Sequence, residues 1–252
     1  MWRSLRAVLR LLAFAGLVVW HYLCFEIGRG LSQSPEQARL RRGAVLQSWA
    51  HATAQAIGMK LVIIGSPPKA PYFLVFNHLS YIDVLLLLAT VDQPMVCARH
   101  DFATWPVLGF VARRMGAIWV HRADFNAMPA VTRDMKAAMT AGYGVVMAPE
   151  ATTTRGDRVY PFHSTLLDPA IQLSVPVHYC SLRYVTGPRD APASTVVNWW
   201  EDLTFFAHGW RLVHADKIDA TIHFGDAPIL EQNRKQLARS LHDAVAAIYE
   251  PM

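Results

Sequence analysis

An apolar stretch lies close to the N-terminus of the chain. Residues 11–25 are apolar apart from His21 and Tyr22, and a helix over residues 7–27 would be about 31 Å long, just enough to cross a bilayer. Arginines flank the stretch on both sides, so positive charge gives no orientation. A cleaved signal peptide is disfavoured because no small-residue cleavage site follows. The pattern predicts a helix that either spans the membrane or lies in one leaflet.

A second helix is predicted directly afterwards. Ser34 and Pro35 form an N-cap followed by proline at the first helical position, and Gly58 can end the helix. Its apolar stripe comprises Val45, Trp49, Ala52 and Ala56, and its positive charges are Arg39, Arg41 and Arg42. The pattern favours a basic amphipathic helix on the membrane, and the alternative is a surface helix packed on the domain. We therefore divide the chain into a membrane-associated segment, residues 1–58, and a main domain, residues 59–252.

From residue 60 onward, short β-rich runs alternate with helical stretches of ten or more residues. This alternation predicts an α/β fold with a mixed, largely parallel sheet of about seven strands covered by helices. The predicted strands are residues 60–65, 72–77, 94–99, 117–122, 143–150, 175–185 and 219–224. The helical stretches lie at residues 81–91, 102–115, 125–142, 162–174, 198–214 and 232–249.

The net charge of +5 is confined to the first 50 residues, which carry seven arginines and two acidic residues. A local basic and apolar segment suits an anionic membrane surface, and it disfavours nucleic acid as a partner. The apolar content of 53% is also high for a soluble protein. Cys24, Cys97 and Cys180 are widely spaced, which predicts free thiols in a reducing compartment.

Polar side chains interrupt the apolar run VFNHLSYIDVLLLL, residues 75–88. His78 follows a predicted strand, and the carboxyl ends of strands are where α/β sheets bind ligands. Positions i and i+5 of one helix point apart, so His78 meets Asp83 only if it lies in the turn before the helix. Asp83 would then hold one imidazole nitrogen and leave the other free as a general base, and Ser80 would cap the helix. The alternative makes His78 a turn residue and Asp83 a mere cap.

Two other predicted strands also end in polar residues. One ends in His121 and Arg122, and the other runs into Glu150, three threonines and Arg155. A shared cleft explains three polar strand ends by one cause. The sequence has no nucleophile elbow, no cysteine near His78 and no tight histidine spacing, so neither a covalent nucleophile nor a metal site is predicted.

A base without a protein nucleophile must activate a hydroxyl group or water from the substrate. Arginines at the other strand ends can hold a phosphate group. The apolar N-terminus indicates that the substrate is a lipid. Together these features favour a lipid hydroxyl that attacks an activated acyl group.

Four short blocks follow one another between about residues 60 and 185. They are N-H-x-S-x-x-D over residues 77–83; Pro106-x-x-Gly109 with residues 116–122; A-P-E-A-T-T-T-R-G over residues 148–156; and Val175-Pro176-Val177. In this order they resemble the blocks of the glycerolipid acyltransferases typified by bacterial 1-acylglycerol-3-phosphate acyltransferase. The second block has His121 where the family has aspartate. The third, usually F-P-E-G-T-R-S, has alanine for glycine and a displaced arginine, like a threonine-rich variant found among bacterial members.

The resemblance implies that residues 59–252 form an acyltransferase domain, with His78 as general base and Asp83 as its orienting partner. It implies an acceptor site formed by Asn77, Ser80, Arg122, Glu150, Thr152 and Arg155, in which Arg122 is a safer phosphate ligand than the displaced Arg155. The donor would be a fatty acyl thioester of coenzyme A or acyl carrier protein, with no cofactor or metal. The acceptor would be a lysolipid, first of all 1-acyl-sn-glycerol-3-phosphate. The protein would act at the bacterial inner membrane with its catalytic domain in the cytoplasm.

Several alternatives stay open at this point. Some members with the threonine-rich variant acylate lysolipids without a glycerol phosphate head, such as lyso-ornithine lipid. A hydrolase would use the same His–Asp pair on water, and a non-catalytic lipid-binding protein would need no base. Residues 198–210 are aromatic enough to touch lipid, although core packing accounts better for most of them.

Overall fold

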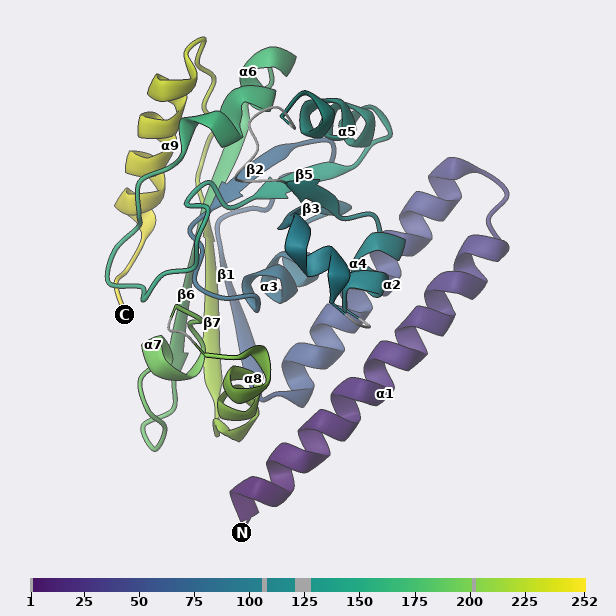
Figure 1. The fold of residues 1–252 in the computed structure, drawn as a ribbon, viewed down its shortest axis with the longest axis vertical. Coiled ribbons are helices and arrows are strands. Elements are labelled where there is room, and N and C mark those ends of the chain that lie inside the picture. Colours follow the sequence, from purple (N-terminus) through teal and green to yellow (C-terminus); the bar gives the residue numbers. More distant parts are fainter. Residues whose placement is uncertain (1, 106–107, 121–127, 201–202) are drawn as a thin grey trace.

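The computed structural model describes residues 2–105, 108–120, 128–200 and 203–252. These residues form one sheet of seven strands in the order β1-β7-β6-β2-β5-β3-β4, with helices on both faces (Figure 1). The strands are β1 (Met59–Ile64), β2 (Phe73–Phe76), β3 (Pro94–Arg99), β4 (Ile118–Val120), β5 (Gly144–Met147), β6 (Val177–Thr186) and β7 (Ile218–Phe224). All neighbouring strands run parallel except β6 and β7, which are antiparallel. The predicted mixed, largely parallel α/β fold is confirmed.

The described helices follow the predicted order, with some differences in extent. They are α1 (Trp2–Gly30), α2 (Pro35–Ala56), α3 (Asp83–Thr90), η1 (His100–Thr104), α4 (Leu108–Arg114), α5 (Met128–Thr140), η3 (Ser164–Leu167), α6 (Asp168–Leu173), α7 (Ala193–Val196), α8 (Phe205–His214) and α9 (Arg234–Ile248). The helix predicted over residues 162–174 is split into η3 and α6, because Pro169 has no N–H and suits the first turn of a new helix. The helical stretch predicted at residues 198–214 becomes helix only at Phe205, after the N-cap Thr204.

The central strand β2 places the polar motif at an edge of the sheet. Its four residues are buried on both faces, since Phe73 and Val75 pack with α5, α6 and α9, whereas Leu74 and Phe76 pack with α2 and α3. A parallel strand buried on both faces reads as an unbroken apolar run. Polar residues begin at Asn77, where the chain leaves the sheet.

Helix α2 packs on the domain, as the second of the two sequence interpretations expects. Ser34 caps it as predicted, and its side chain accepts a hydrogen bond from the N–H of Gln37 at 3.2 Å. Leu46, Ala50 and Ala54 of α2 belong to the same hydrophobic core as the sheet. The amphipathic interpretation places Arg42 on the face toward the membrane. In the structure Arg42 is buried and donates to backbone carbonyls at 2.8 and 3.0 Å. The boundary predicted at residue 58 stays a prediction, but no break in the core coincides with it.

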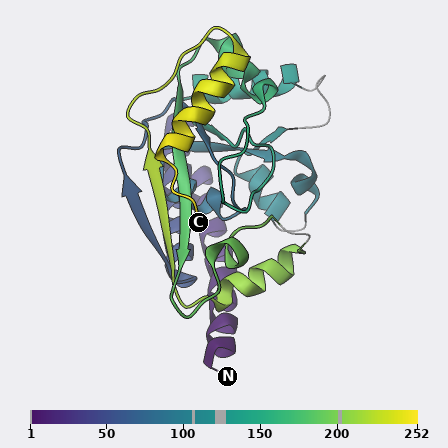
Figure 2. The same ribbon diagram turned by 90° about the vertical axis from the view of Figure 1, so that its left-hand side faces the viewer.

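Helix α1 runs antiparallel to α2 and extends past the end of the domain (Figures 1 and 2). Only 17% of its most apolar window is buried, and its length and apolarity are sufficient to cross a membrane. A core helix of a soluble protein would instead be covered by its neighbours. The structure therefore presents α1 as an apolar helix with a large exposed surface, consistent with the predicted membrane association.

Candidate active site

The turn between β2 and α3 brings His78 and Asp83 together, as the sequence predicts. Nδ1 of His78 lies 2.7 Å from Oδ2 of Asp83. Because a carboxylate oxygen accepts, Nδ1 carries the proton and Nε2 keeps its lone pair. The His78 side chain is 18% exposed, and its Nε2 makes no hydrogen bond within the described part of the chain. The geometry therefore presents an imidazole whose second nitrogen, Nε2, is accessible to a substrate.

Asp83 is held by four donors although its side chain is fully buried. Oδ2 accepts from the imidazole and from the backbone N–H groups of Leu79, at 2.8 Å, and Ser80, at 3.0 Å. Oδ1 accepts from the hydroxyl of Tyr184 on β6, at 2.7 Å. A buried carboxylate with this many donors is stabilised in its charged form. Asp83 can therefore stabilise the imidazolium that forms when His78 takes a proton.

The backbone around His78 is fixed from two other elements. The N–H of His78 donates to Oε1 of Glu150 at 2.8 Å, and its carbonyl accepts from the N–H of Thr154 at 2.9 Å. The side chain of Asn77 makes two hydrogen bonds to the backbone of Leu182 on β6, at 2.7 and 3.0 Å. Asn77 and Glu150 thus position His78, and their predicted contact with the acceptor stays a prediction.

Glu150 follows β5 and is almost completely buried, at 2% exposure. Its second oxygen, Oε2, accepts from the N–H of Tyr160 at 3.1 Å. Burial raises the pKa of Glu150 to about 8, although the backbone N–H groups of His78 and Tyr160 oppose the increase. Glu150, which holds the loop that carries His78, is therefore a weaker acid than an ordinary carboxyl group.

The remaining predicted site residues are less closely engaged. The hydroxyl of Ser80 is buried and makes no hydrogen bond among the described residues, and the N-cap of α3 is Ile82, so the prediction that Ser80 caps this helix is wrong. Thr152 is exposed, and the exposed Arg155 places its guanidinium 5.5 Å from the ring centre of Trp200. Arg122 lies outside the described residues. The substrate contacts predicted for these four residues stay predictions.

One residue of the site and one cation at a strand end escaped the sequence analysis. Tyr184 was placed on a strand, and no local pattern connects it to Asp83, which lies 101 positions earlier. Arg99 ends β3, the neighbour of β5, and lines a shallow cleft with Met147 and Ala148 at the end of β5. The rule that polar residues at strand ends mark the site would have found Arg99.

The departure from the family pattern at Ala151 carries a conformational strain. The family glycine is replaced by alanine, yet Ala151 adopts a left-handed backbone conformation, with φ at 60°. A side chain in this conformation costs about 1–2 kcal/mol, which glycine avoids. Glycine at this position would relieve the strain, but part of the gain in stability is lost because glycine also raises the conformational entropy of the unfolded chain.

We expect Ala151→Gly to raise the free energy of unfolding by about 0.5–1 kcal/mol. Urea unfolding followed by circular dichroism in detergent measures the change. Ala244→Gly, in the interior of α9, is the matched control and should destabilise, because glycine weakens a helix interior. A destabilised Ala151→Gly variant would contradict the strain at this position.

We expect Tyr184→Phe to lower kcat/KM about tenfold at neutral pH, from the loss of one hydrogen bond to a charged group. The variant leaves Oδ1 of Asp83 buried and unpaired, which makes protonation of the neighbouring His78 more favourable. The acidic limb of the pH profile of kcat/KM should therefore move to higher pH. Tyr179→Phe, on the same strand, is the control because its hydroxyl makes no hydrogen bond within the described residues. A lower rate with an unmoved acidic limb would show that Tyr184 has only a structural role.

Comparisons with known proteins find acyltransferases among the proteins similar to this chain. The profile of the Acyltransferase family matches residues 61–183. A lyso-ornithine lipid O-acyltransferase of Pseudomonas aeruginosa is 25% identical over 232 residues, covering 91% of this chain and 85% of that protein. A 1-acyl-sn-glycerol-3-phosphate acyltransferase of Neisseria gonorrhoeae is 27% identical over 247 residues, covering 95% and 92%.

A solved structure shows the same fold. The crystal structure of the 1-acyl-sn-glycerophosphate acyltransferase of Thermotoga maritima matches with a TM-score of 0.69 at 18% identity, covering 97% of this chain and 95% of that one. The region matched by the family profile contains His78, Asp83 and Glu150, which the structure brings together. The family profile, the relatives and the fold together support an acyltransferase of the glycerolipid acyltransferase family.

Proposed function

We propose that this protein is a membrane-bound O-acyltransferase that moves a fatty acyl group from an acyl thioester to the free hydroxyl of a lysolipid. The proposed acceptor is 1-acyl-sn-glycerol-3-phosphate, the product is phosphatidic acid, and the donor is acyl-coenzyme A or acyl carrier protein. The observation that carries the proposal is the accessible Nε2 of His78, backed by the buried carboxylate of Asp83 at 2.7 Å from Nδ1.

The residues suggest a direct transfer. The lysolipid hydroxyl donates to Nε2 of His78, which takes its proton as the oxygen attacks the thioester carbonyl. The new C–O bond forms, the C–S bond breaks, and the thiol leaves with the proton from the imidazolium. Asp83 favours this sequence because its negative charge is most stabilising when the imidazole is protonated.

Arginines at neighbouring strand ends support a phosphate-bearing acceptor. Arg99 ends β3, where its guanidinium pairs with Asp101 at 2.6 Å, and Arg122 follows the adjacent strand β4 in the sequence. Guanidinium groups bind phosphate through paired, charge-assisted hydrogen bonds. The second candidate acceptor is lyso-ornithine lipid, which is favoured by the name of the Pseudomonas relative and by the threonine-rich third block.

One assay tests the function and the acceptor together. Purified full-length protein in detergent receives one labelled acyl thioester and, separately, lysophosphatidic acid, lyso-ornithine lipid, lysophosphatidylethanolamine or no acceptor. We expect the fastest transfer to lysophosphatidic acid, and Arg122→Lys should raise the KM of that acceptor while the KM of the thioester stays constant. Faster transfer to lyso-ornithine lipid would overturn the acceptor. Thiol release at an equal rate without any acceptor would instead identify a hydrolase.

We also propose that α1 lies in one leaflet of the bacterial inner membrane, with the catalytic domain on the cytoplasmic side. Near its N-terminus, Arg6 donates to the carbonyl of His214 at 3.1 Å, and near its C-terminus Glu26 pairs with Arg114 of α4 at 2.7 Å. A helix that crosses the bilayer would carry one end away from the domain. Tags at the two chain ends should therefore be cleaved from the same side of sealed vesicles. Cleavage from opposite sides would indicate a spanning helix.

A further inference from the structure

Helix α8 has an apolar face that no described residue covers. The buried side of the helix consists of His208, Leu212 and Val213. On the opposite side Phe206 is 85% exposed and Trp210 is 46% exposed. The two residues are four positions apart, so they are neighbours on the helix surface. Large aromatic side chains paired in this way indicate a surface that contacts another apolar phase.

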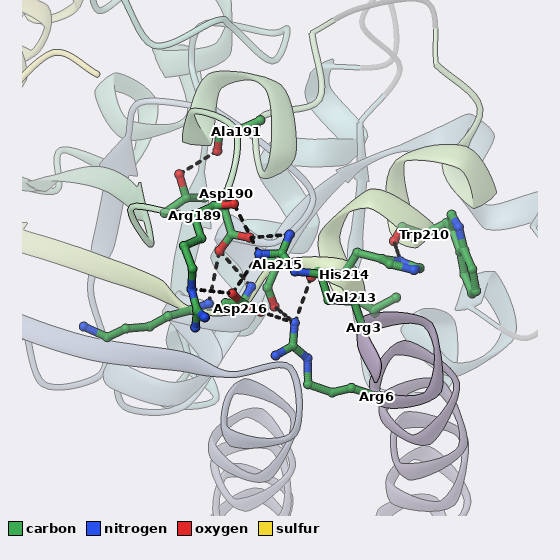
Figure 3. Close-up of polar contacts among 12 residues, drawn as sticks. Arg3, Arg6, Arg189, Asp190, Ala191, Trp210, Val213, His214, Ala215 and Asp216 are labelled. Carbon is green, nitrogen blue, oxygen red and sulfur yellow. Dashed lines mark hydrogen bonds and ion pairs between the residues drawn. The ribbon is translucent and has the colours of Figure 1, made fainter. Parts of the chain in front are cut away.

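Arginines of α1 fix this helix to the membrane-associated segment (Figure 3). Arg10 donates to the carbonyl of Val213 at 3.0 Å, and Arg6 donates to that of His214 at 3.1 Å. Arg3 and Arg6 both pair with Asp216, just beyond the end of α8. These contacts satisfy carbonyls that a helix C-terminus leaves unpaired and place cations at its negative end. Helices α1 and α8 are therefore held side by side, and each keeps an exposed apolar face.

The exposed apolar face of α1 continues this surface along the domain. Along its whole length α1 exposes large apolar side chains, namely Trp2, Leu5, Val8, Leu9, Leu11, Leu12, Val19, Trp20, Leu23 and Ile27. Toward its C-terminal end it meets α4, whose Phe110 is 51% exposed and lies 5.9 Å, between ring centres, from Tyr22. The apolar surface thus extends from α8 along α1 to α4.

The same surface lies close to the catalytic loop. The ring of Phe206 contacts that of Phe205, at 5.7 Å between centres, and Phe205 contacts Tyr81 at 4.9 Å. Tyr81 belongs to the Asn77–Asp83 motif. Two ring contacts therefore separate the most exposed aromatic residue of α8 from the loop that carries His78.

We propose that Phe206 and Trp210 of α8, together with Phe110 of α4, insert into the bilayer as a second lipid-contact surface beside α1. This inference rests on the proposed membrane location of α1. Continuity with α1 favours lipid as the occupant, and Phe and Trp suit the boundary between head groups and acyl chains. Three of the arginines that make the N-terminus basic are engaged with the domain, so the contact is apolar and does not depend on anionic lipid. The surface places the catalytic loop against the bilayer, from which a lysolipid acceptor must come.

The first test measures binding of the full-length chain to vesicles. We expect the Phe206→Ser/Trp210→Ser double variant to bind vesicles of phosphatidylcholine at least tenfold more weakly in flotation, as the loss of two large apolar contacts implies. The loss should be equal in vesicles that contain phosphatidylglycerol. Leu230→Ser is the matched control, since Leu230 is 55% exposed and lies between β7 and α9. A double variant that binds as tightly as the wild type would overturn the proposal.

The second test locates Trp210 directly. Brominated phosphatidylcholine should quench part of the tryptophan fluorescence of the wild type, and the quenched part should be smaller in Trp210→Phe, in which the exposed Trp2 and Trp20 of α1 remain. Equal quenching in both proteins would place Trp210 outside the bilayer. Size-exclusion chromatography in detergent tests whether a second copy of the chain covers this surface instead of lipid. A dimer of the wild type together with a monomer of the double variant would overturn the lipid assignment. Acyl transfer in detergent tests the proposed function independently of membrane binding. The double variant should keep the wild-type turnover number there, whereas a wild type without transfer in detergent would refute the function alone.

Discussion

Replacing His78 with alanine should abolish most of the acyl transfer while the protein stays folded. Loss of a general base lowers rates by about 10²–10⁴, and no second histidine among the described residues contacts Asp83. The measurement is kcat with a labelled thioester and the preferred lysolipid, together with the thermal unfolding midpoint. His51→Ala, on the exposed side of α2, is the control for the removal of an imidazole and should change neither value. A His78→Ala protein that keeps more than about a tenth of the wild-type turnover would refute the assignment of the base.

Asp83→Asn separates charge from geometry at the same pair. An asparagine can direct its oxygen toward His78 and the two backbone N–H groups, and its amide nitrogen toward the hydroxyl of Tyr184, so the turn can keep its shape. The negative charge that stabilises the imidazolium is lost. We expect kcat to fall at least tenfold, and the double variant with His78→Ala to be no slower than His78→Ala alone, because the two residues act as a unit.

Sequence patterns predicted local features of this molecule better than contacts between residues far apart in the sequence. The strands could be found because each is a short apolar run bounded by turn residues. The His78–Asp83 contact could be predicted because only four residues, which form a turn, separate the two positions. The hydrogen bond between Tyr184 and Asp83 depends on the pairing of β2 with β6, and strand order is set by contacts across a hundred residues. No local pattern contains that information.

The arginines of the N-terminal segment show a second limit of prediction from sequence. Their density predicted a surface for anionic lipid, because a local run of positive charge usually faces solvent or membrane. In the structure Arg10 and Arg42 are buried and bind backbone carbonyls of the domain. A buried guanidinium is tolerated when carbonyls surround it, but sequence alone does not show where such carbonyls will lie. The exposed apolar residues of α1 are therefore a better indication of membrane association than its positive charges are.

The free energy of unfolding should depend strongly on pH because the carboxyl group of Glu150 is buried. Burial raises its pKa from 4.5 to about 8 in the folded state, so the folded protein holds this proton more tightly than the unfolded chain does. The stability that the bound proton contributes is complete below pH 4.5 and is lost as the pH rises through about 8. A pKa difference of this size corresponds to about 5 kcal/mol, and the two N–H groups that bind the carboxylate already oppose it.

Glu150→Gln removes this titration while keeping the size of the side chain. Its amide nitrogen must face one backbone N–H, which adds a penalty that does not change with pH. The advantage of the wild type in free energy of unfolding should therefore be largest near pH 5 and should shrink by several kcal/mol toward pH 9. Urea unfolding in detergent across this range measures the difference, and Glu36→Gln controls for the loss of an exposed carboxylate. Two unfolding curves that stay parallel from pH 5 to pH 9 would mean that Glu150 remains ionised throughout, held by the N–H groups of His78 and Tyr160.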